Sequence, residues 1–277
     1  MTFKDLEYSF NRAFLYSFSK KKFLFVFPLL IVCSILILFC RALGYSASNW
    51  ISMSLTFLPI LLSAGIVLAL GLLLIRIYYH EVKSLKITFK KLFLSSFDLI
   101  IATIYLCIPP ILLYLFLWII LGIFMLLKEI PALGEFISIV LSFAPFLIIL
   151  SSVLLVIISV LVLFFITPAV ALNSKDHMSI AKKVFFRIKK SIFSNLIYFL
   201  VALLPIAIVA LILYFSAVLT KINYLEINSS LTSTLKWFFI SLPFCFFLTP
   251  AIIFFFNFAA ESFNNFLKHE RESHNEG

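Results

Sequence analysis

The side chains that most often bind metals or carry out catalysis are few in this sequence and widely spaced. The histidines and cysteines form no CxxC pair and no HExxH helix, and the chain has no glycine-rich phosphate loop and no GxSxG motif. All the cysteines lie in apolar runs, where a thiol acts as a small hydrophobic side chain. We therefore expect no metal, no cofactor and no enzymatic activity. The residues concerned are Cys33, Cys40, Cys107, Cys245, His80, His177, His269 and His274.

A charge inside an apolar run would be the next candidate for chemistry. Asp98 comes closest, because it lies at the start of a long apolar run. Lys90 and Lys91 precede it, so an interfacial carboxylate at a helix start explains it structurally. No other acidic group lies within the apolar runs, and the sequence favours neither an ion-coupled transporter nor a membrane hydrolase.

Two threonine–proline pairs interrupt apolar runs at similar positions, in "FITPAV" (165–170) and "FLTPAI" (247–252). Proline within a helix removes one hydrogen bond and frees a carbonyl one turn earlier. The neighbouring threonine hydroxyl can pair with the freed backbone. We predict helix kinks at Thr167, Pro168, Thr249 and Pro250. The kinks either line a cavity or are bends that fit the helices together.

Composition places the chain among membrane proteins. Of its 277 residues, 64% are hydrophobic and 12% are charged, whereas soluble domains average about 45–50% and about 25%. Six uncharged stretches can each cross a hydrocarbon core of about 30 Å as a helix. The first is expected to be an uncleaved anchor, since no small-residue cleavage site follows it. The six stretches are 23–40, 53–75, 99–127, 138–172, 193–219 and 237–260.

The fourth stretch is the longest and allows two interpretations. We expect one long helix that starts along the membrane interface, bends at Pro145 and then crosses. The alternative is an interfacial helix followed by a separate span.

Positive charge is concentrated between the apolar stretches. Eighteen of the 22 lysines and arginines lie in segments 4–22, 76–91, 175–190 and 268–271, which six spans place on one side. Cytoplasmic loops carry the excess of Lys and Arg. We therefore expect a multi-pass protein of the bacterial cytoplasmic (inner) membrane with N- and C-termini in the cytoplasm. The net charge of +10 in this arrangement favours anionic lipid, not nucleic acid, as its partner.

Three of the basic segments also show the spacing of amphipathic helices, within 6–17, 84–97 and 179–193. Such helices lie in the interface plane while their lysines reach the headgroups. A solvated loop is the alternative for 175–190. The residues expected to contact anionic headgroups are Lys86, Lys90, Lys91, Lys182, Lys183, Arg187 and Lys190.

The amphipathic segments belong to an internal repeat. "SFNRAFLYSFS" (9–19) aligns with "TFKKLFLSSFD" (88–98), and Ser84, Ser96 and Pro110 recur 95 residues later as Ser179, Ser191 and Pro205. The predicted fold is an all-α polytopic membrane protein with six transmembrane helices in three hairpin repeats, each preceded by a basic amphipathic interfacial helix. The chain forms a single integral membrane domain, 1–277. Its units are 1–80, 81–175 and 176–262, with a short polar cytoplasmic tail at 263–277.

Polar and small residues inside the spans give weaker packing signals. Asn257, Ser151 and Ser152 are expected to form hydrogen bonds between helices. Gly65 and Ala69 form a small-xxx-small face that predicts a close helix contact.

The stretch "LVLFFITPAVALNSKDHMSIAKKVFFRIKKS" (161–191) resembles bacterial six-span inner-membrane proteins of the YciC-like family. It also resembles the membrane domain that is sometimes fused to glycerophosphodiester phosphodiesterases. The match is carried by Ser179, Ile180, Lys182 and Ser191. The resemblance implies the topology and a lipid-facing setting, and it implies no reaction.

These features predict a non-enzymatic integral membrane protein, a scaffold or accessory factor in envelope or lipid homeostasis. Its expected partners are membrane lipids with anionic headgroups, and a membrane protein partner or a homo-oligomer are both open. The alternative is a passive transporter or flippase of a lipid or other amphipathic molecule, with a cavity between the kinked spans.

Overall fold

A computed structural model of the chain describes residues 3–45, 47–84, 89–128, 130, 134–135, 139, 142–172, 192–220 and 231–275. Within these ranges it describes only the backbone of residues 3, 49, 89–100, 102–106, 192, 231–233 and 269–275.

The described chain is all helical, with seven α-helices and one short 3-10 helix, η1. In a bilayer each backbone N–H and C=O must pair within its own segment, which is why long apolar segments become helices. Six of the helices are long and apolar enough to cross a membrane. The elements are α1 (Phe3–Leu15), η1 (Tyr16–Phe18), α2 (Lys20–Tyr45), α3 (Asn49–Val82), α4 (Phe89–Leu127), α6 (Ala144–Leu172), α8 (Ile192–Leu219) and α9 (Leu231–Asn275).

The predicted spans agree with these helices, and the fourth needs a correction. Each of the six uncharged stretches overlaps one candidate membrane span of the structure. The long helix expected to bend at Pro145 is wrong, because α6 begins at Ala144, directly after a turn at Ser142 and Phe143. Proline fits the first turn of a helix, where its missing N–H has no partner to lose. Pro145 therefore starts this span instead of bending it.

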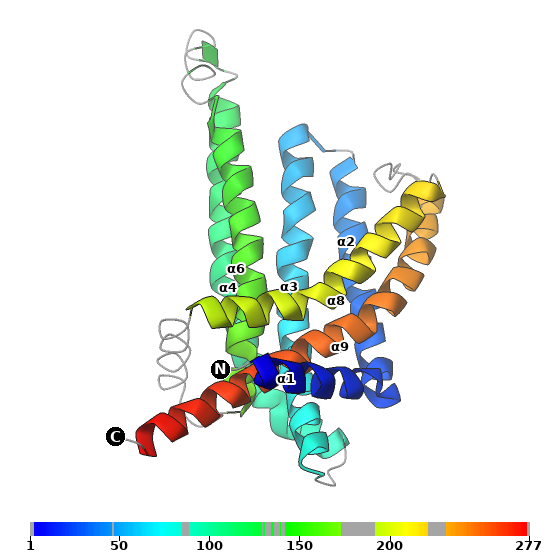
Figure 1. Cartoon of the computed structure of the whole chain (residues 1–277). Coiled ribbons are helices and arrows are strands. Elements are labelled where there is room, and N and C mark those ends of the chain that lie inside the picture. Colours follow the sequence, from blue (N-terminus) through cyan, green and yellow to red (C-terminus); the bar gives the residue numbers. More distant parts are fainter. Residues whose placement is uncertain are drawn as a thin grey trace.

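Helix α3 is the central element of the bundle. It packs against α2, α4, α6 and α9. The α4–α6 pair runs alongside α3, whereas α8 and α9 cross the bundle obliquely, and α1 lies across α9 (Figure 1). Helix α9 continues without interruption past residue 263, and Phe263 and Phe266 are buried. The segment expected to be a polar tail therefore begins as part of the core.

Two hydrophobic clusters hold the helices together. The larger joins α2, α3, α6, α8 and α9 to Ala13 of α1, and the smaller is centred on Tyr114 and Trp118 of α4. In the larger cluster Gly71 allows the buried ring of Phe256 to lie against α3, because a Cβ at this position would be 2.1 Å from a ring carbon. The expected close contact at Gly65 is looser, with 3.6 Å to Cys107.

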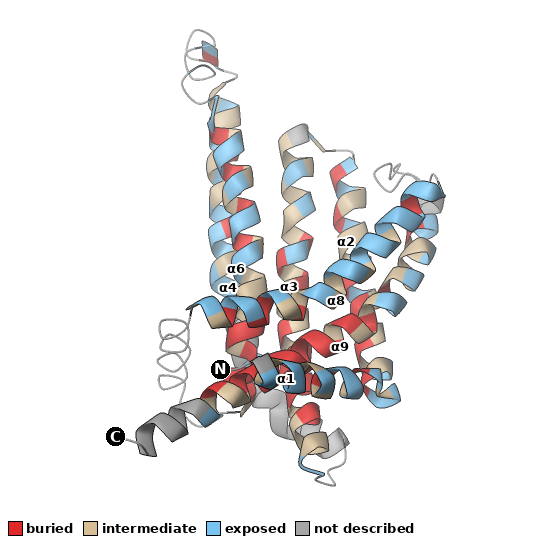
Figure 2. Ribbon diagram, in the orientation of Figure 1, coloured by how far each residue is buried: buried red, intermediate tan, exposed pale blue. Residues whose placement is uncertain are grey.

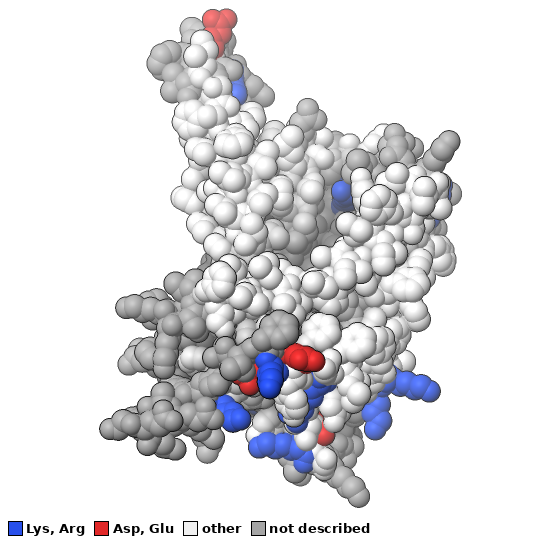
Figure 3. Space-filling view, in the orientation of Figure 1, with Lys and Arg blue, Asp and Glu red and all other residues white. Residues whose placement is uncertain are grey.

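Apolar side chains cover much of the outer surface. Much of α8 is exposed (Figure 2). Leu200, Leu204 and Leu211 of this helix are 50–58% exposed. In contact with lipid tails, which are as apolar as leucine, the exposure of such side chains carries no free-energy penalty. The described lysines and arginines gather mainly at the end of the bundle where α1 lies (Figure 3). The charged end and the apolar sides together fit a protein embedded in a membrane.

Candidate functional site

A buried ion pair joins the start of α2 to the end of α3. Lys22 is completely buried, and its Nζ lies 2.6 Å from Oε2 of Glu81. The same Nζ donates a hydrogen bond to the carbonyl oxygen of Tyr16 at 3.3 Å. It also lies 5.1 Å from the ring centre of Tyr78 and 5.8 Å from that of Tyr16, within the range of cation–π attraction. These four contacts replace the water that the ammonium loses on burial.

A second charged group lies directly beyond Tyr78. The Tyr78 hydroxyl donates a 2.5 Å hydrogen bond to Oε1 of Glu261 on α9. This length is typical of a hydroxyl bound to a carboxylate. Glu261 is 3% exposed, and a guanidinium nitrogen of Arg12 on α1 lies 3.7 Å from the same oxygen. Tyr16 and Tyr78 pack edge to face, with ring centres 5.7 Å apart, and so connect the two charged groups.

Neutral polar contacts extend this region along the seam between α1 and α9. The Asn265 amide donates to Oγ of Ser9 at 2.8 Å. The Asn257 amide donates to the carbonyl oxygen of Ala13 at 3.4 Å and to Oγ of Ser17 at 3.5 Å. Asn257 therefore forms the bonds between helices that its position predicted. Ser9 and Ala13 of α1 and Ser17 of η1 are buried, and these small residues let this segment approach α9 closely.

We call Arg12, Lys22, Tyr78, Glu81 and Glu261 the charge clasp. Its two cations and two carboxylates balance, and it links α1, α2, α3 and α9. Removing one partner of a buried ion pair leaves an uncompensated charge and typically costs about 3–5 kcal/mol. The clasp is therefore suited to fix the relative positions of these helices.

The comparisons with known proteins add no assignment. No family model, no curated protein and no solved structure matches the chain.

An apolar groove of about 700 Å³ lies next to the clasp, and we call it the α2–α3–α4 groove. The residues that line it lie within 24–29 of α2, 62–73 of α3 and 107–111 of α4. It opens to the outside, since Leu24 is 77% and Ile108 is 39% exposed. A second groove, of about 310 Å³, lies between residues 30–38 of α2 and 237–248 of α9.

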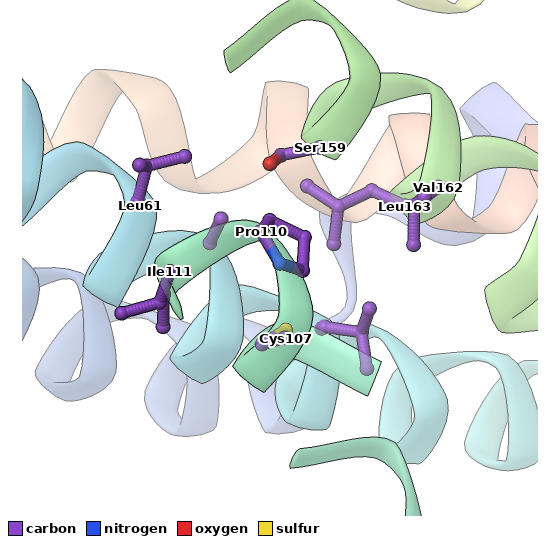
Figure 4. Close-up of a pocket in the computed structure, with 9 residues that line it drawn as sticks. Leu61, Cys107, Pro110, Ile111, Ser159, Val162 and Leu163 are labelled. Atoms are coloured by element: carbon purple, nitrogen blue, oxygen red, sulfur yellow. The ribbon is translucent and has the colours of Figure 1, made fainter. Parts of the chain in front are cut away.

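A small cavity of about 20 Å³ lies between α3, α4 and α6 (Figure 4). Leu61, Pro110 and Leu163 are among the apolar residues around it. Ser159 supplies the one hydroxyl of its lining, and that hydroxyl donates to the carbonyl oxygen of Leu155 at 2.8 Å. The space is about that of one water, which needs two or more polar partners, so the cavity is a packing defect and not a ligand site.

The predicted kink residues lie in helices α6 and α9, as expected, but their hydroxyls differ from the prediction. Thr167, Pro168 and Thr249 are buried, and Pro250 is half-buried. The Thr249 hydroxyl donates to the carbonyl oxygen of Cys245 at 2.7 Å, whereas Pro250 frees the carbonyl of residue 246. Within the described chain, the Thr167 hydroxyl has no hydrogen-bond partner. None of the four residues lines the three spaces described above.

Two further predictions concern the cysteines and the serines of the fourth span. Cys33, Cys40 and Cys245 are buried, as expected of small hydrophobic residues, whereas Cys107 is half-buried. Ser152 accepts a hydrogen bond from the Trp118 indole at 3.3 Å, which confirms its predicted contact between helices.

The predicted lipid-contacting side chains fall outside the described part of the structure. Residues 86, 182, 183, 187 and 190 lie outside the described ranges, and only the backbone of 90, 91 and 98 is described. Lys86, Lys90, Lys91, Lys182, Lys183, Arg187 and Lys190 therefore stay predictions.

Sequence reasoning missed the charge clasp because it counted all span-flanking charges as loop residues. A signal was present. Lys22 directly precedes the first span, Glu261 directly follows the last, and Glu81 is the first carboxylate after the second. Opposite charges that abut different spans at the same membrane surface are candidates for pairing.

Proposed function

We propose that this chain is a non-enzymatic integral membrane protein that acts as a scaffold or accessory factor in envelope or lipid homeostasis. The charge clasp is the observation that supports this most. Its carboxylates and cations pair with one another. Glu261 contacts Tyr78 and Arg12, and Lys22 contacts Glu81. Such mutual pairing stabilises one arrangement of helices, which is what a scaffold needs.

The proposed topology has both termini on the cytoplasmic side of the bacterial inner membrane. The gathering of lysine and arginine at one end of the bundle supports it, because that end would face the cytoplasm (Figure 3). We also propose three hairpin repeats, each preceded by a basic amphipathic helix. Contacts within the pairs α2–α3, α4–α6 and α8–α9 support the hairpins. The resemblance to the YciC-like family remains part of this proposal.

The partners in this proposal are anionic lipids and a second membrane protein or a second copy of the chain. Mild extraction with native lipids, followed by mass spectrometry, tests it. We expect anionic lipid together with one reproducible protein partner or a defined oligomer. Retention of neither, in a protein that remains folded, would contradict the scaffold role.

The basic segment 175–190 allows a sharper test of the lipid contacts. Reversal to glutamate at Lys182, Lys183, Arg187 and Lys190 is expected to release the segment from anionic bilayers, since each such residue contributes about 1 kcal/mol near a charged surface. Hydrogen exchange of this segment in anionic and zwitterionic nanodiscs measures the change. Equal protection in both nanodiscs, for both proteins, would count against these contacts.

A passive transporter or flippase is the second candidate, and one observation favours it. The α2–α3–α4 groove holds about 700 Å³, and the molecule is hollowed between the α4–α6 and α8–α9 pairs (Figure 3). Because Pro168 and Pro250 do not line this groove, the test is Ala69→Leu, which fills it and should abolish lipid exchange between the leaflets of proteoliposomes while the protein stays folded. A wild-type protein that exchanges no lipid leaves the scaffold as the better account.

A further inference from the structure

The α2–α3–α4 groove has the length of one leaflet. Its α3 wall runs from Leu62 to Leu73, which at 1.5 Å per residue is roughly 16 Å. Half of a hydrocarbon core of about 30 Å is about 15 Å. The groove therefore accommodates a chain that runs from one membrane surface to the middle of the bilayer.

The walls of the groove are those of an acyl-chain site. Leucine, isoleucine and phenylalanine side chains form most of them. Gly65 and Ala69 are small residues, so the groove is deeper where α3 lines it. At Gly65 an added methyl would meet only Cys107, at 3.6 Å, so no bulky neighbour fills the space in front of this residue. The small residues that predicted a helix contact here instead leave room beside α3.

One end of the groove carries positive charge. Lys21 lies three and four residues before Leu24 and Phe25, so it stands one turn away on the same face of α2. Lys20 is its neighbour, and both side chains are exposed. Lys22 points the other way, into the charge clasp. Two of the three consecutive lysines are thus left at the mouth of the groove.

The same end also has a backbone acceptor. Pro28 lines the groove and has no N–H, so it cannot donate the usual helical hydrogen bond to the carbonyl oxygen of Leu24. Leu24 also lines the groove. The end of the groove therefore offers two ammonium groups and one carbonyl oxygen. This set matches a phosphate with a neighbouring hydroxyl donor, as in a glycerol headgroup.

We propose that the α2–α3–α4 groove binds one anionic phospholipid of the surrounding leaflet. Its phosphate lies at Lys20 and Lys21, and one acyl chain runs along Leu24, Ala69 and Ile108 toward the middle of the membrane. An anionic phospholipid would then be the lipid on which the proposed role in lipid homeostasis acts. The biological meaning of the site rests on that proposed function. Binding itself does not depend on any protein partner.

The test is native mass spectrometry of the delipidated full chain, titrated with phosphatidylglycerol or with phosphatidylcholine of the same acyl chains. We expect one phosphatidylglycerol to bind before all others, and phosphatidylcholine to lack such a step. K20Q/K21Q should weaken the first binding step about 25-fold, at about 5-fold for each lysine. A69L should also weaken this first phosphatidylglycerol step, because the larger side chain fills the part of the groove that holds the acyl chain.

Two control variants match these changes outside the groove. K4Q/K268Q removes two exposed lysines from α1 and α9, and A210L adds the same bulk to the exposed surface of α8. Both should bind the first lipid as the wild type does. Equal losses in K20Q/K21Q and K4Q/K268Q, or no loss in A69L, would overturn the site and leave a non-specific lipid shell.

The two proposals can fail separately. A protein that keeps its partner after mild extraction but shows no first lipid step lacks this site and remains a scaffold. A protein with the lipid step but without partner or oligomer keeps the site and loses the scaffold role.

Discussion

The charge clasp gives a quantitative prediction for Tyr78→Phe. The substitution removes one hydroxyl from a fully packed position, and the Glu261 carboxylate, 3% exposed, loses its 2.5 Å hydrogen bond. Among the described residues, Arg12, at 3.7 Å, then remains to compensate the charge. A hydrogen bond to a charged group contributes about 1.5–3 kcal/mol. Because water cannot reach this carboxylate, we expect the free energy of unfolding to fall by about 2–3 kcal/mol.

The chain offers a matched control in Tyr114→Phe. Tyr114 is also completely buried, and its hydroxyl donates a 2.5 Å hydrogen bond, but to the neutral carbonyl oxygen of Ser54. Loss of such a bond costs about 0.5–1.5 kcal/mol. The two variants remove the same atom from equally buried rings, so the difference between them isolates the charge of Glu261. We expect Tyr78→Phe to cost about 1.5 kcal/mol more.

Equilibrium unfolding in mixed detergent micelles, followed by circular dichroism, measures both free energies. A double-mutant cycle with Glu261→Gln completes the assay. In Glu261→Gln the carboxylate becomes a neutral amide, so loss of the Tyr78 hydroxyl costs less free energy. The coupling energy between Tyr78 and Glu261 should therefore be about 1.5 kcal/mol and favourable. A coupling energy near zero, or equal costs for Tyr78→Phe and Tyr114→Phe, would refute the idea that this hydrogen bond compensates a buried charge.

Two further predictions use the same unfolding assay in lipid-free detergent. Gly71→Ala should lower the free energy of unfolding by about 1–3 kcal/mol, because the added methyl would clash with the buried ring of Phe256. Gly65→Ala should be neutral or should stabilise the protein by up to about 1 kcal/mol. Equal effects of the two substitutions would mean that the Phe256 ring moves away freely. Lys22→Met should cost about 3 kcal/mol, the low end for a broken buried ion pair because its carboxylate partner is 28% exposed. Lys21→Met, at an exposed position, should stay within about 0.5 kcal/mol, and a similar loss in both variants would place Lys22 at the surface.

The spans and several polar contacts could be predicted because each depends on a local property. Chain length and hydropathy decide where a helix crosses a bilayer. A polar side chain such as Asn257 or Ser152, deep in an apolar helix, has no water and must find a protein partner. For both residues the structure supplies that partner on another helix or its flanking turn. These inferences needed no knowledge of how the helices are arranged.

Two features depend on how the helices are arranged and could not be predicted from the sequence. They are the charge clasp and which of Gly65 and Gly71 lies in a close helix contact. Glu81 and Glu261 are 180 residues apart in sequence. Glu81 meets Lys22 because α2 packs on α3, and Glu261 meets Tyr78 because α9 packs on α3. Gly65 and Gly71 lie on the same helix and have similar apolar neighbours in sequence. Only Gly71 faces an aromatic ring, because α9 passes it with Phe256.

The start of α2 shows how one short charged segment serves two environments. Lys20, Lys21 and Lys22 are chemically identical, yet successive residues on a helix point about 100° apart. Lys22 is thereby directed at Glu81, whereas Lys21 lies one turn before Leu24 and Phe25, which line the α2–α3–α4 groove. The ion pair holds α2 against α3, and these two helices form two of the three walls of the groove. Breaking the pair with Lys22→Met should therefore also weaken the first phosphatidylglycerol step, although Lys22 faces away from the lipid.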